Sequence, residues 1–407
     1  MAPESAFTRR SLLAYSGKAA LALSAGSLLD LSLGAGSAAA KRHVHIADRL
    51  GAYSGCVNIE ATKALEHYLG RPLAFVHDFV PTGEDWSRLY RQDYAFAQHW
   101  TRPGSPYLDR MYLSVPLLVQ RDTTKVDGPG PPTTLAHAAS GHYDKHYEAL
   151  GRQLVDVGLG SARIRIGWEM NDMPGPAGPL ANWSAGTTRD GDRNFVLAFR
   201  RMVEAMRSVP GQSFKFVWCP AIVSNWSPAL GRRIDPERCY PGDRYVSIIA
   251  CDVYDRRWAH NTSARVRWAD IASARYGNVT SLAWFERFVR PGHKRQNNDG
   301  SHHVGHGHAA PGARKPLGLG EFGTFRKPGE RPGQRDGGDN PYFLHELAAW
   351  MDGLGAHRWD HLNYWNFGAG GEITPVGYYP RWDSAVRDLF GARHARTARR
   401  RRRRRRR

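Results

Sequence analysis

Residues 162–171 read Ala-Arg-Ile-Arg-Ile-Gly-Trp-Glu-Met-Asn, and this stretch decides the fold class. Ile164 and Ile166 alternate with polar or small residues at a period of two, which predicts a short strand. Glu169 follows at the point where this strand should give way to a loop. In α/β barrels the reactive side chains stand at the C-terminal ends of the strands, so this carboxylate indicates a barrel with a site at that end.

A second stretch downstream has the same layout. Residues 316–323 read Pro-Leu-Gly-Leu-Gly-Glu-Phe-Gly, a short apolar strand followed by one carboxylate, Glu321, and a turn. Two glutamates at the ends of two strands predict a pair of groups, one serving as acid and base and the other as nucleophile.

Strands and helices alternate along the rest of the chain. The predicted strands are His43–Ala47, Leu73–Phe79, Met111–Leu118, Ala162–Glu169, Phe214–Pro220, Val246–Tyr254, Leu317–Glu321 and Leu362–Phe367. The predicted helices are Asn58–Leu69, Tyr143–Val157, Arg193–Ser208, Leu282–Val289 and Pro341–Leu354. This alternation predicts an α/β fold, a single-domain (β/α)₈ TIM barrel with long loops. A doubly wound open sheet is the alternative, but no GxGxxG motif follows the first strand, which disfavours its dinucleotide-binding form.

The two ends of the chain differ from the barrel in composition. Residues 1–40 contain the twin arginines Arg9 and Arg10, an apolar run and a closing Ala-Ala-Ala, the layout of a twin-arginine signal peptide. Lys18 and Asp30 interrupt the apolar run, so we expect no stable membrane span, with an uncleaved anchor as the alternative. The sequence therefore predicts a signal peptide over 1–40, a barrel over 41–391 and a disordered tail over 392–407 in a secreted or cell-wall-associated protein.

The charge of the chain is concentrated in its tail. The net charge is +19, and nine of these charges are Arg399 to Arg407, which leaves a body of +10. A run of arginines binds polyanions without reading a sequence, so an anionic cell-wall polymer is a possible partner of the tail. The body carries no nucleic-acid recognition motif, and we expect no specific nucleic acid as partner. We also expect a monomer.

Cysteines and histidines give weaker signals. The four cysteines, Cys56, Cys219, Cys239 and Cys251, form no CxxC pair, which gives a zinc ribbon no support. In an exported protein one or two disulfides are possible, for example Cys239 with Cys219 or Cys251, and the pairing stays open. The His-rich run 301–308 could bind a metal, although a solvated loop is the plainer interpretation.

The pair Glu169 and Glu321 suits the cleavage of a glycosidic bond. A retaining glycosidase uses one carboxyl group as acid and base and another, about 5–5.5 Å away, as nucleophile. Strands four and seven of a barrel can supply that pair, and the reaction needs no cofactor or metal. Arg165 lies about 13 Å along the strand from Glu169, so we expect it to pair with another inward carboxylate, Asp78 or Asp252.

The motifs resemble glycoside hydrolase family 26, the β-mannanase-like family of the retaining (β/α)₈ glycosidase clan. The run from Arg165 through Glu169 to Asn171 resembles the R-x-x-H-E-M-N motif of that family, and the run around Glu321 resembles its nucleophile strand. The resemblance extends from about Val44 to Phe390. One position departs from the motif, because Trp168 stands where the family has His, and Trp cannot accept a hydrogen bond.

The resemblance implies roles for further residues. Glu169 and Glu321 would be catalytic, Tyr254 would hydrogen-bond Glu321, and Trp365 would form an aromatic floor, with Trp218 in a similar place. Trp168 and Asn171 are further candidates for substrate contact, Asn171 alternatively as a cap.

The implied function is that of a secreted retaining endo-β-glycosidase acting on a β-linked polysaccharide of the mannan or glucan class. A barrel that binds cell-surface glycans without cleaving them is the alternative. The sugar, the linkage and the choice between endo and exo action stay open.

Overall fold

The structure is a computed structural model that describes residues 44–80, 85–90, 99–122, 131–173, 183–223, 225–255, 263–273, 280–290, 295–296, 302–303, 315–325, 337–368 and 375–392. The predicted signal peptide, the arginine tail and most of the His-rich run lie outside these residues. Predictions about them remain predictions.

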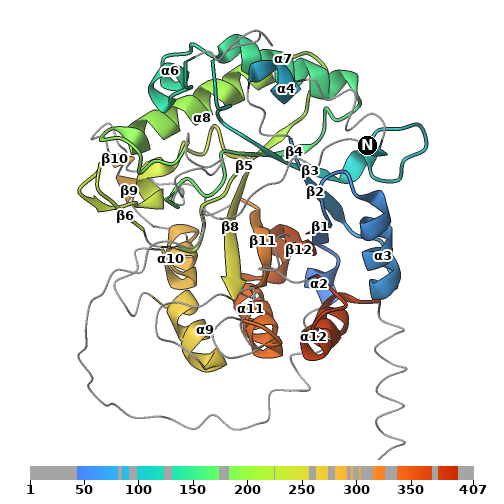
Figure 1. Cartoon of the computed structure of the whole chain (residues 1–407). Helices are drawn as coiled ribbons and strands as arrows, with labels where there is room; N and C mark the ends of the chain where they lie inside the picture. The colour runs from blue at the N-terminus through green and yellow to red at the C-terminus, as the bar shows by residue number, and fades with distance from the viewer. Residues whose placement is uncertain are drawn as a thin grey trace, which may run out of the picture.

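The centre of the molecule is a closed barrel of parallel strands, which confirms the predicted (β/α)₈ class (Figure 1). Around the barrel the order is β1-β12-β11-β8-β5-β4-β3-β2, so sequence neighbours are also neighbours in space. The barrel strands are β1 (Leu50–Tyr53), β2 (Phe75–Phe79), β3 (Met111–Val115), β4 (Arg163–Ile166), β5 (Lys215–Trp218), β8 (Ile248–Asp255), β11 (Leu317–Thr324) and β12 (Trp359–Trp365). Glu169 therefore follows the fourth barrel strand, and Glu321 belongs to the seventh.

Helices surround the barrel. The α-helices are α2 (Val44–Ala47), α3 (Ile59–Leu69), α4 (Trp86–Tyr90), α6 (Leu135–Ala139), α7 (Asp144–Asp156), α8 (Gly191–Arg207), α9 (Ala264–Ala272), α10 (Leu282–Phe288), α11 (Pro341–Leu354) and α12 (Pro380–Phe390). The short 3₁₀ helices are η2 (Leu108–Arg110), η4 (Pro236–Cys239) and η5 (Ala356–Arg358). Two small antiparallel pairs lie outside the barrel: β6 (Trp226–Ser227) with β7 (Arg232–Arg233), and β9 (Arg295–Gln296) with β10 (His302–His303).

Local sequence explains where the helices begin and end. In α3 the Asn58 side chain accepts a hydrogen bond from the Ala61 amide, and Gly70 ends the helix in the left-handed conformation at φ 68°. These are the preferred residues for an N-terminal cap and for the position after a helix. In α11 Pro341 occupies the first turn, where its missing N–H costs no hydrogen bond.

The prediction of the first strand was wrong. Residues 44–47 form helix α2, and the first strand is Leu50–Tyr53. All four residues of β1 are buried, because β1 pairs with β2 and β12 and is covered on both faces. A parallel strand covered on both faces shows no alternation of polar and apolar residues, so its pattern could not be found at a period of two.

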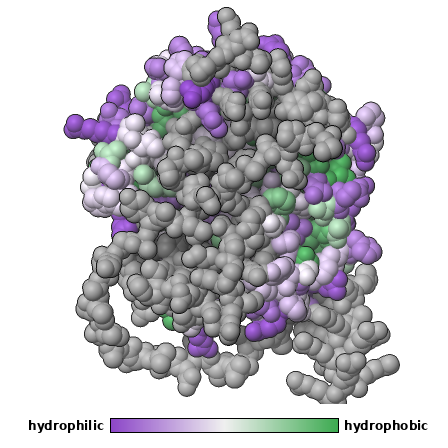
Figure 2. Space-filling view, in the orientation of Figure 1, coloured by the Kyte–Doolittle hydropathy of each residue, from purple (hydrophilic) through white to green (hydrophobic). Residues whose placement is uncertain are grey.

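The interior of the protein is divided by the barrel wall. Most buried apolar residues lie in one large core, while Tyr112, Val217, Cys219, Ile248 and Ala250 form a small separate cluster. All four cysteines are unpaired thiols, so the possible disulfides are not formed. Within the described ranges, no helix is both long and apolar enough to cross a membrane. Figure 2 shows mainly hydrophilic side chains with smaller hydrophobic patches on the described part of one face.

Candidate active site

Glu169 stands in a tight turn directly after β4. The strand ends at Ile166, earlier than predicted, because Gly167 (φ 48°) and Glu169 (φ 54°) both adopt left-handed backbone conformations. A β-carbon at position 167 would lie 3.0 Å from the Leu117 Cβ, so glycine is needed there. The Glu169 amide donates to the Cys219 carbonyl at 2.9 Å, which fixes the turn to the end of β5. A left-handed glutamate is uncommon, and such conformations persist where the surroundings impose them, often at functional sites.

Glu321 reaches the barrel interior through an irregularity in β11. Leu319 pairs with Cys251 of β8 and Glu321 with the next residue, Asp252, so Gly320 is one extra residue on β11. Strict alternation would direct Glu321 outward with Leu319. A bulge shifts the alternation by one residue and turns the carboxylate inward. A β-carbon at Gly320 would lie 2.5 Å from both Asp252 Oδ1 and Cys219 Sγ, so the bulge also depends on glycine.

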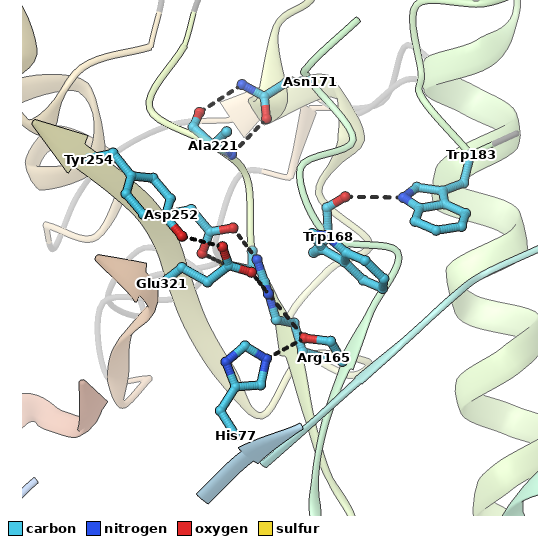
Figure 3. Close-up of polar contacts among 11 residues, drawn as sticks. His77, Arg165, Trp168, Asn171, Trp183, Ala221, Asp252, Tyr254 and Glu321 are labelled. Atoms are coloured by element: carbon cyan, nitrogen blue, oxygen red, sulfur yellow. Dashed lines mark hydrogen bonds and ion pairs between the residues drawn. The ribbon is translucent and has the colours of Figure 1, made fainter. Parts of the chain in front are cut away.

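The two glutamates meet at the end of the barrel together with a third carboxylate, Asp252 of β8. Figure 3 shows Asp252 and Glu321 side by side next to Arg165. One carboxylate oxygen from each of Glu169, Asp252 and Glu321 lies within 4.8 Å of the other two. Glu321 and Asp252 are buried, whereas Glu169 is partly exposed at the mouth of the site. The more accessible carboxyl group is thus next to solvent, and the two deeper ones lie below it.

Arg165 compensates the negative charge of this cluster. It is fully buried, and its Nη1 donates to Glu321 Oε1 at 2.6 Å while its Nη2 is hydrogen-bonded to Asp252. Burial alone would lower the pKa of Arg165, but the neighbouring Asp252 and Glu321 raise it well above its ordinary value. The predicted partner Asp252 is confirmed. Asp78 is not a partner, since it accepts hydrogen bonds from Trp100 Nε1 and the Val57 amide.

Tyr254 donates its hydroxyl proton to the other oxygen of Glu321, Oε2, at 2.6 Å. Burial, followed by the charge of Glu321, raises the pKa of Tyr254 well above its ordinary value, so the phenol keeps its proton. Both oxygens of Glu321 therefore receive a hydrogen bond, which fixes the orientation of this side chain. This contact agrees with the role that the sequence resemblance implied for Tyr254.

The surroundings of Glu169 favour its protonated form. Burial, followed by the charges of Asp252 and Glu321, raises its pKa well above its ordinary value. Burial also raises the pKa of Asp252 to about 8, against the opposing effect of Arg165, and a hydrogen bond from Glu169 stabilises the ionised Asp252. Glu169 can thus hold a proton at neutral pH next to Glu321, which is hydrogen-bonded to Arg165 and Tyr254. Two carboxyl groups with such different environments can act as acid and nucleophile.

The same three carboxylates have the composition of a cation site, because oxygen ligands suit Mg²⁺ and Ca²⁺. Their charge is already compensated, however. Arg165 forms ion pairs with Asp252 and Glu321, so a cation would have to displace a fully buried guanidinium. The arrangement therefore fits acid–base chemistry better than metal binding.

Aromatic side chains form one wall of the site. Trp365 at the end of β12 is half-buried, and its ring centroid lies 4.5 Å from that of Tyr53 and 5.8 Å from that of Phe79. Trp168 is only 7% exposed and packs edge-on against Phe79, so little more than its rim can touch a ligand. Trp365 and Phe79 thus offer more accessible ring surface than Trp168 does.

Two predicted substrate contacts need correction. Trp218 is fully buried outside the barrel interior, where its Nε1 donates to the Cys239 carbonyl at 3.1 Å and its ring packs on Tyr240. Asn171 is also fully buried. Its amide donates to the Ala221 carbonyl at 2.8 Å and its Oδ1 accepts from the Ala221 amide at 2.9 Å (Figure 3). Asn171 therefore joins the loops after β4 and β5, and neither side chain is available to a substrate.

Several residues of the site were not predicted to belong to it. His77 Nε2 lies 2.8 Å from Ser114 Oγ, and Ser114 Oγ also accepts from Arg165 Nη1 at 3.0 Å. Cys219 Sγ donates to Asp252 Oδ1 at 3.1 Å. Asp252 was predicted only as a partner of Arg165, although it shares the inward face of β8 with Tyr254. His77 and Ser114 support Arg165 from β2 and β3.

The fold and the site together define a (β/α)₈ barrel that carries an arginine-bridged group of carboxylates at the C-terminal end of its strands. No family model matches the chain, and no curated protein matches it by sequence.

Solved structures with a similar fold include an endo-β-1,4-mannanase of Cellulomonas fimi (16% identity, TM-score 0.46, covering 88% of this chain and 75% of that one). A GH26 β-mannanase from Bacteroides ovatus has 12% identity and a TM-score of 0.46, covering 88% of this chain and 93% of that one. An endo-β-mannanase/endo-β-glucanase of Prevotella bryantii has 14% identity and a TM-score of 0.45; the match covers 86% of this chain but only 45% of the other. At these identities the likeness is one of fold.

Proposed function

We propose that this protein is a retaining glycoside hydrolase. The observation that carries the proposal is the separation of Glu169 and Glu321, whose nearest carboxylate oxygens lie within 4.8 Å. Retaining enzymes have carboxyl groups about 5–5.5 Å apart, whereas inverting enzymes need about 6.5–9.5 Å to admit a water molecule between them. The short separation supports direct attack by one carboxylate on the sugar.

The contacts of the two glutamates support distinct roles. Glu169, protonated and partly exposed, donates its proton to the glycosidic oxygen as the bond to the anomeric carbon breaks. Glu321, ionised between Arg165 and Tyr254, attacks that carbon and forms a glycosyl ester. Glu169, now a carboxylate, then takes a proton from water. The resulting hydroxide attacks the anomeric carbon and releases Glu321, so the sugar keeps its configuration.

The proposed substrate is a β-linked polysaccharide of the mannan or glucan class. The class follows from the motif resemblance around Glu169 and Glu321, and the half-buried ring of Trp365 supports it, because an aromatic face can pack against the apolar face of a sugar ring. We also propose that the protein is a monomer, that the twin-arginine signal exports it, and that it is secreted or associated with the cell wall. In this proposal the arginine tail binds an anionic wall polymer.

Activity assays on β-mannan, β-glucan and xylan test the proposal. Replacing Glu321 by Ala should reduce turnover at least 10³-fold, and Glu169→Ala should reduce it about 10²–10⁴-fold. The partly exposed Glu148 on α7 supplies the matched control, and Glu148→Gln should keep full activity. Product anomers followed by NMR should show retention. Full activity of Glu321→Ala, or inversion, would exclude the mechanism, and binding of a glycan without turnover by the wild type would favour the non-hydrolytic alternative.

A further inference from the structure

One large aromatic side chain is unusually accessible. Trp226 is 59% exposed, more than Tyr378 (48%) or Val266 (38%), the other exposed large apolar residues among those described. A single exposed apolar residue is common on protein surfaces and needs no explanation by itself. Trp226 is of interest because of its position relative to the turn that carries Glu169.

Trp226 belongs to the two-stranded pair β6–β7, whose inner side is firmly held. Ser227 is fully buried, and its Oγ donates to the Gly186 carbonyl at 2.6 Å. Arg232 points toward α8 and forms an ion pair with Asp192. Because side chains alternate along a strand, the neighbours of Ser227 and Arg232, namely Trp226 and Arg233, face the other way, toward solvent.

Trp226 and Arg233 stand side by side. They are direct partners in the antiparallel register, which brings their β-carbons to about 4.5–5.5 Å of each other on one face. Arg233 is exposed as well. The indole offers a flat apolar surface and the guanidinium a planar set of N–H donors, so the pair can contact both the apolar face of a sugar ring and its hydroxyl groups.

The pair is attached to the turn that carries Glu169. The side-chain amide of Asn225, next to Trp226, donates to the side-chain carboxylate of Asp172. The backbone amide of Asp172 in turn donates to the backbone carbonyl of Glu169 at 2.8 Å. These links keep the Cα atoms of Trp226 and Glu169 within about 20 Å of each other. Trp226 and Arg233 therefore lie in the same part of the molecule as Glu169.

We propose that Trp226 and Arg233 form a distal sugar-binding platform for a polysaccharide chain that extends beyond the cleavage point. The proposal rests on the glycoside hydrolase function above and deepens it. A platform outside the group of carboxylates favours long chains over short glycosides, as an enzyme that cleaves inside a polymer requires.

The test compares Trp226→Ala, Trp226→Phe and Arg233→Ala with the control Val266→Ala, an exposed apolar position on α9. For each variant kcat/KM is measured on soluble β-mannan and β-glucan and on a short aryl β-glycoside. We expect Trp226→Ala to lower kcat/KM about tenfold on the polymer and less than twofold on the aryl glycoside. Arg233→Ala should lower kcat/KM on the polymer about threefold. Trp226→Phe should keep most of the wild-type kcat/KM on the polymer. Equal losses on both substrates, or no loss on the polymer, would overturn the platform.

Affinity electrophoresis in gels containing each polysaccharide separates this proposal from the hydrolytic one. The variants are made in a Glu321→Gln background, which removes turnover and leaves the β6–β7 pair unchanged. Retardation that Trp226→Ala abolishes and Val266→Ala preserves supports the platform even if the wild type shows no hydrolysis. Retardation unchanged by Trp226→Ala overturns the platform while leaving hydrolysis standing, and a wild type that neither binds nor cleaves any of these polymers contradicts both proposals.

Discussion

The Nη1 atom of Arg165 lies 2.6 Å from Oε1 of Glu321, in a part of the barrel where the arginine side chain has no contact with solvent. The same guanidinium is bonded to Asp252. A strand residue four positions before Glu169 therefore compensates the two deeper carboxylates of the site. The predictions below follow from this arrangement and from the backbone that supports it.

Replacing Arg165 by Met should strongly destabilise the protein. The substitution leaves two buried carboxylates without their counter-charge, and the loss of one partner of a buried ion pair typically costs about 3–5 kcal/mol. Chemical denaturation measures the change in the free energy of unfolding. The control is Arg152→Met, which removes an exposed ion pair with Glu148 and should cost less than about 1 kcal/mol. Equal effects of the two variants would show that Arg165 has no special role.

Replacing Asp252 by Asn should move the alkaline limb of the pH profile of kcat/KM to lower pH. After burial, the charge of Asp252 is the largest cause that raises the pKa of Glu169. Without that charge Glu169 loses its proton at lower pH, and with it the ability to act as acid. Rates measured from pH 4 to 10 on both proteins test this. An alkaline limb that stays in place or moves upward would contradict the role of Asp252.

The stability of the wild type should fall as the pH rises between about 4 and 8. Burial raises the pKa of Asp252 from 3.8 to about 8, so the folded protein holds this proton where the unfolded chain releases it. The stabilisation is complete below the unfolded pKa and is lost as the pH passes the folded pKa. Denaturation at several pH values should show this decline, and Asp252→Asn should flatten it. An unchanged slope in the variant would assign the decline to other groups.

Replacing Gly320 by Ala adds only one methyl group, but we expect it to lower both stability and activity. The new methyl group would lie 2.5 Å from Asp252 Oδ1 and from Cys219 Sγ, so the bulge that directs Glu321 inward must shift. We expect a loss of stability of about 1–3 kcal/mol and a fall in kcat of at least tenfold. Gly353→Ala, in helix α11 with nothing within 4 Å of the added carbon, should instead be neutral or stabilising.

Trp218 and Trp365 should respond to substitution in different ways. Trp218→Ala removes a fully buried indole and should cost about 3–5 kcal/mol of stability, with KM for a short glycoside unchanged. Trp365→Ala removes a half-buried ring of the aromatic wall beside Tyr53 and Phe79 and should lower kcat/KM at least tenfold. Thermal unfolding and steady-state kinetics on both variants separate the two cases. A raised KM in the folded Trp218 variant would restore it as a substrate contact.

The sequence by itself determined the architecture and singled out the two glutamates that meet at the end of the barrel. The alternation of strands and helices specified the barrel, and the two glutamates stood out because single carboxylates followed short apolar strands. Tyr254 was found through its motif. These features depend on local periodicity and on chain order, both of which a sequence records directly.

Only the tertiary structure decided which side chains face the site. Alternation would have turned Glu321 outward with Leu319, and the extra residue Gly320 in β11, seen only in its register with β8, turns it inward. Trp218 looked like a strand-end aromatic but packs on the outer side of the barrel, and Asn171 joins two loops. The union of Arg165 with Glu321 and Asp252 depends on strands far apart in the chain. Such contacts arise when the barrel closes, because closure brings the inward faces of its strands together across the interior.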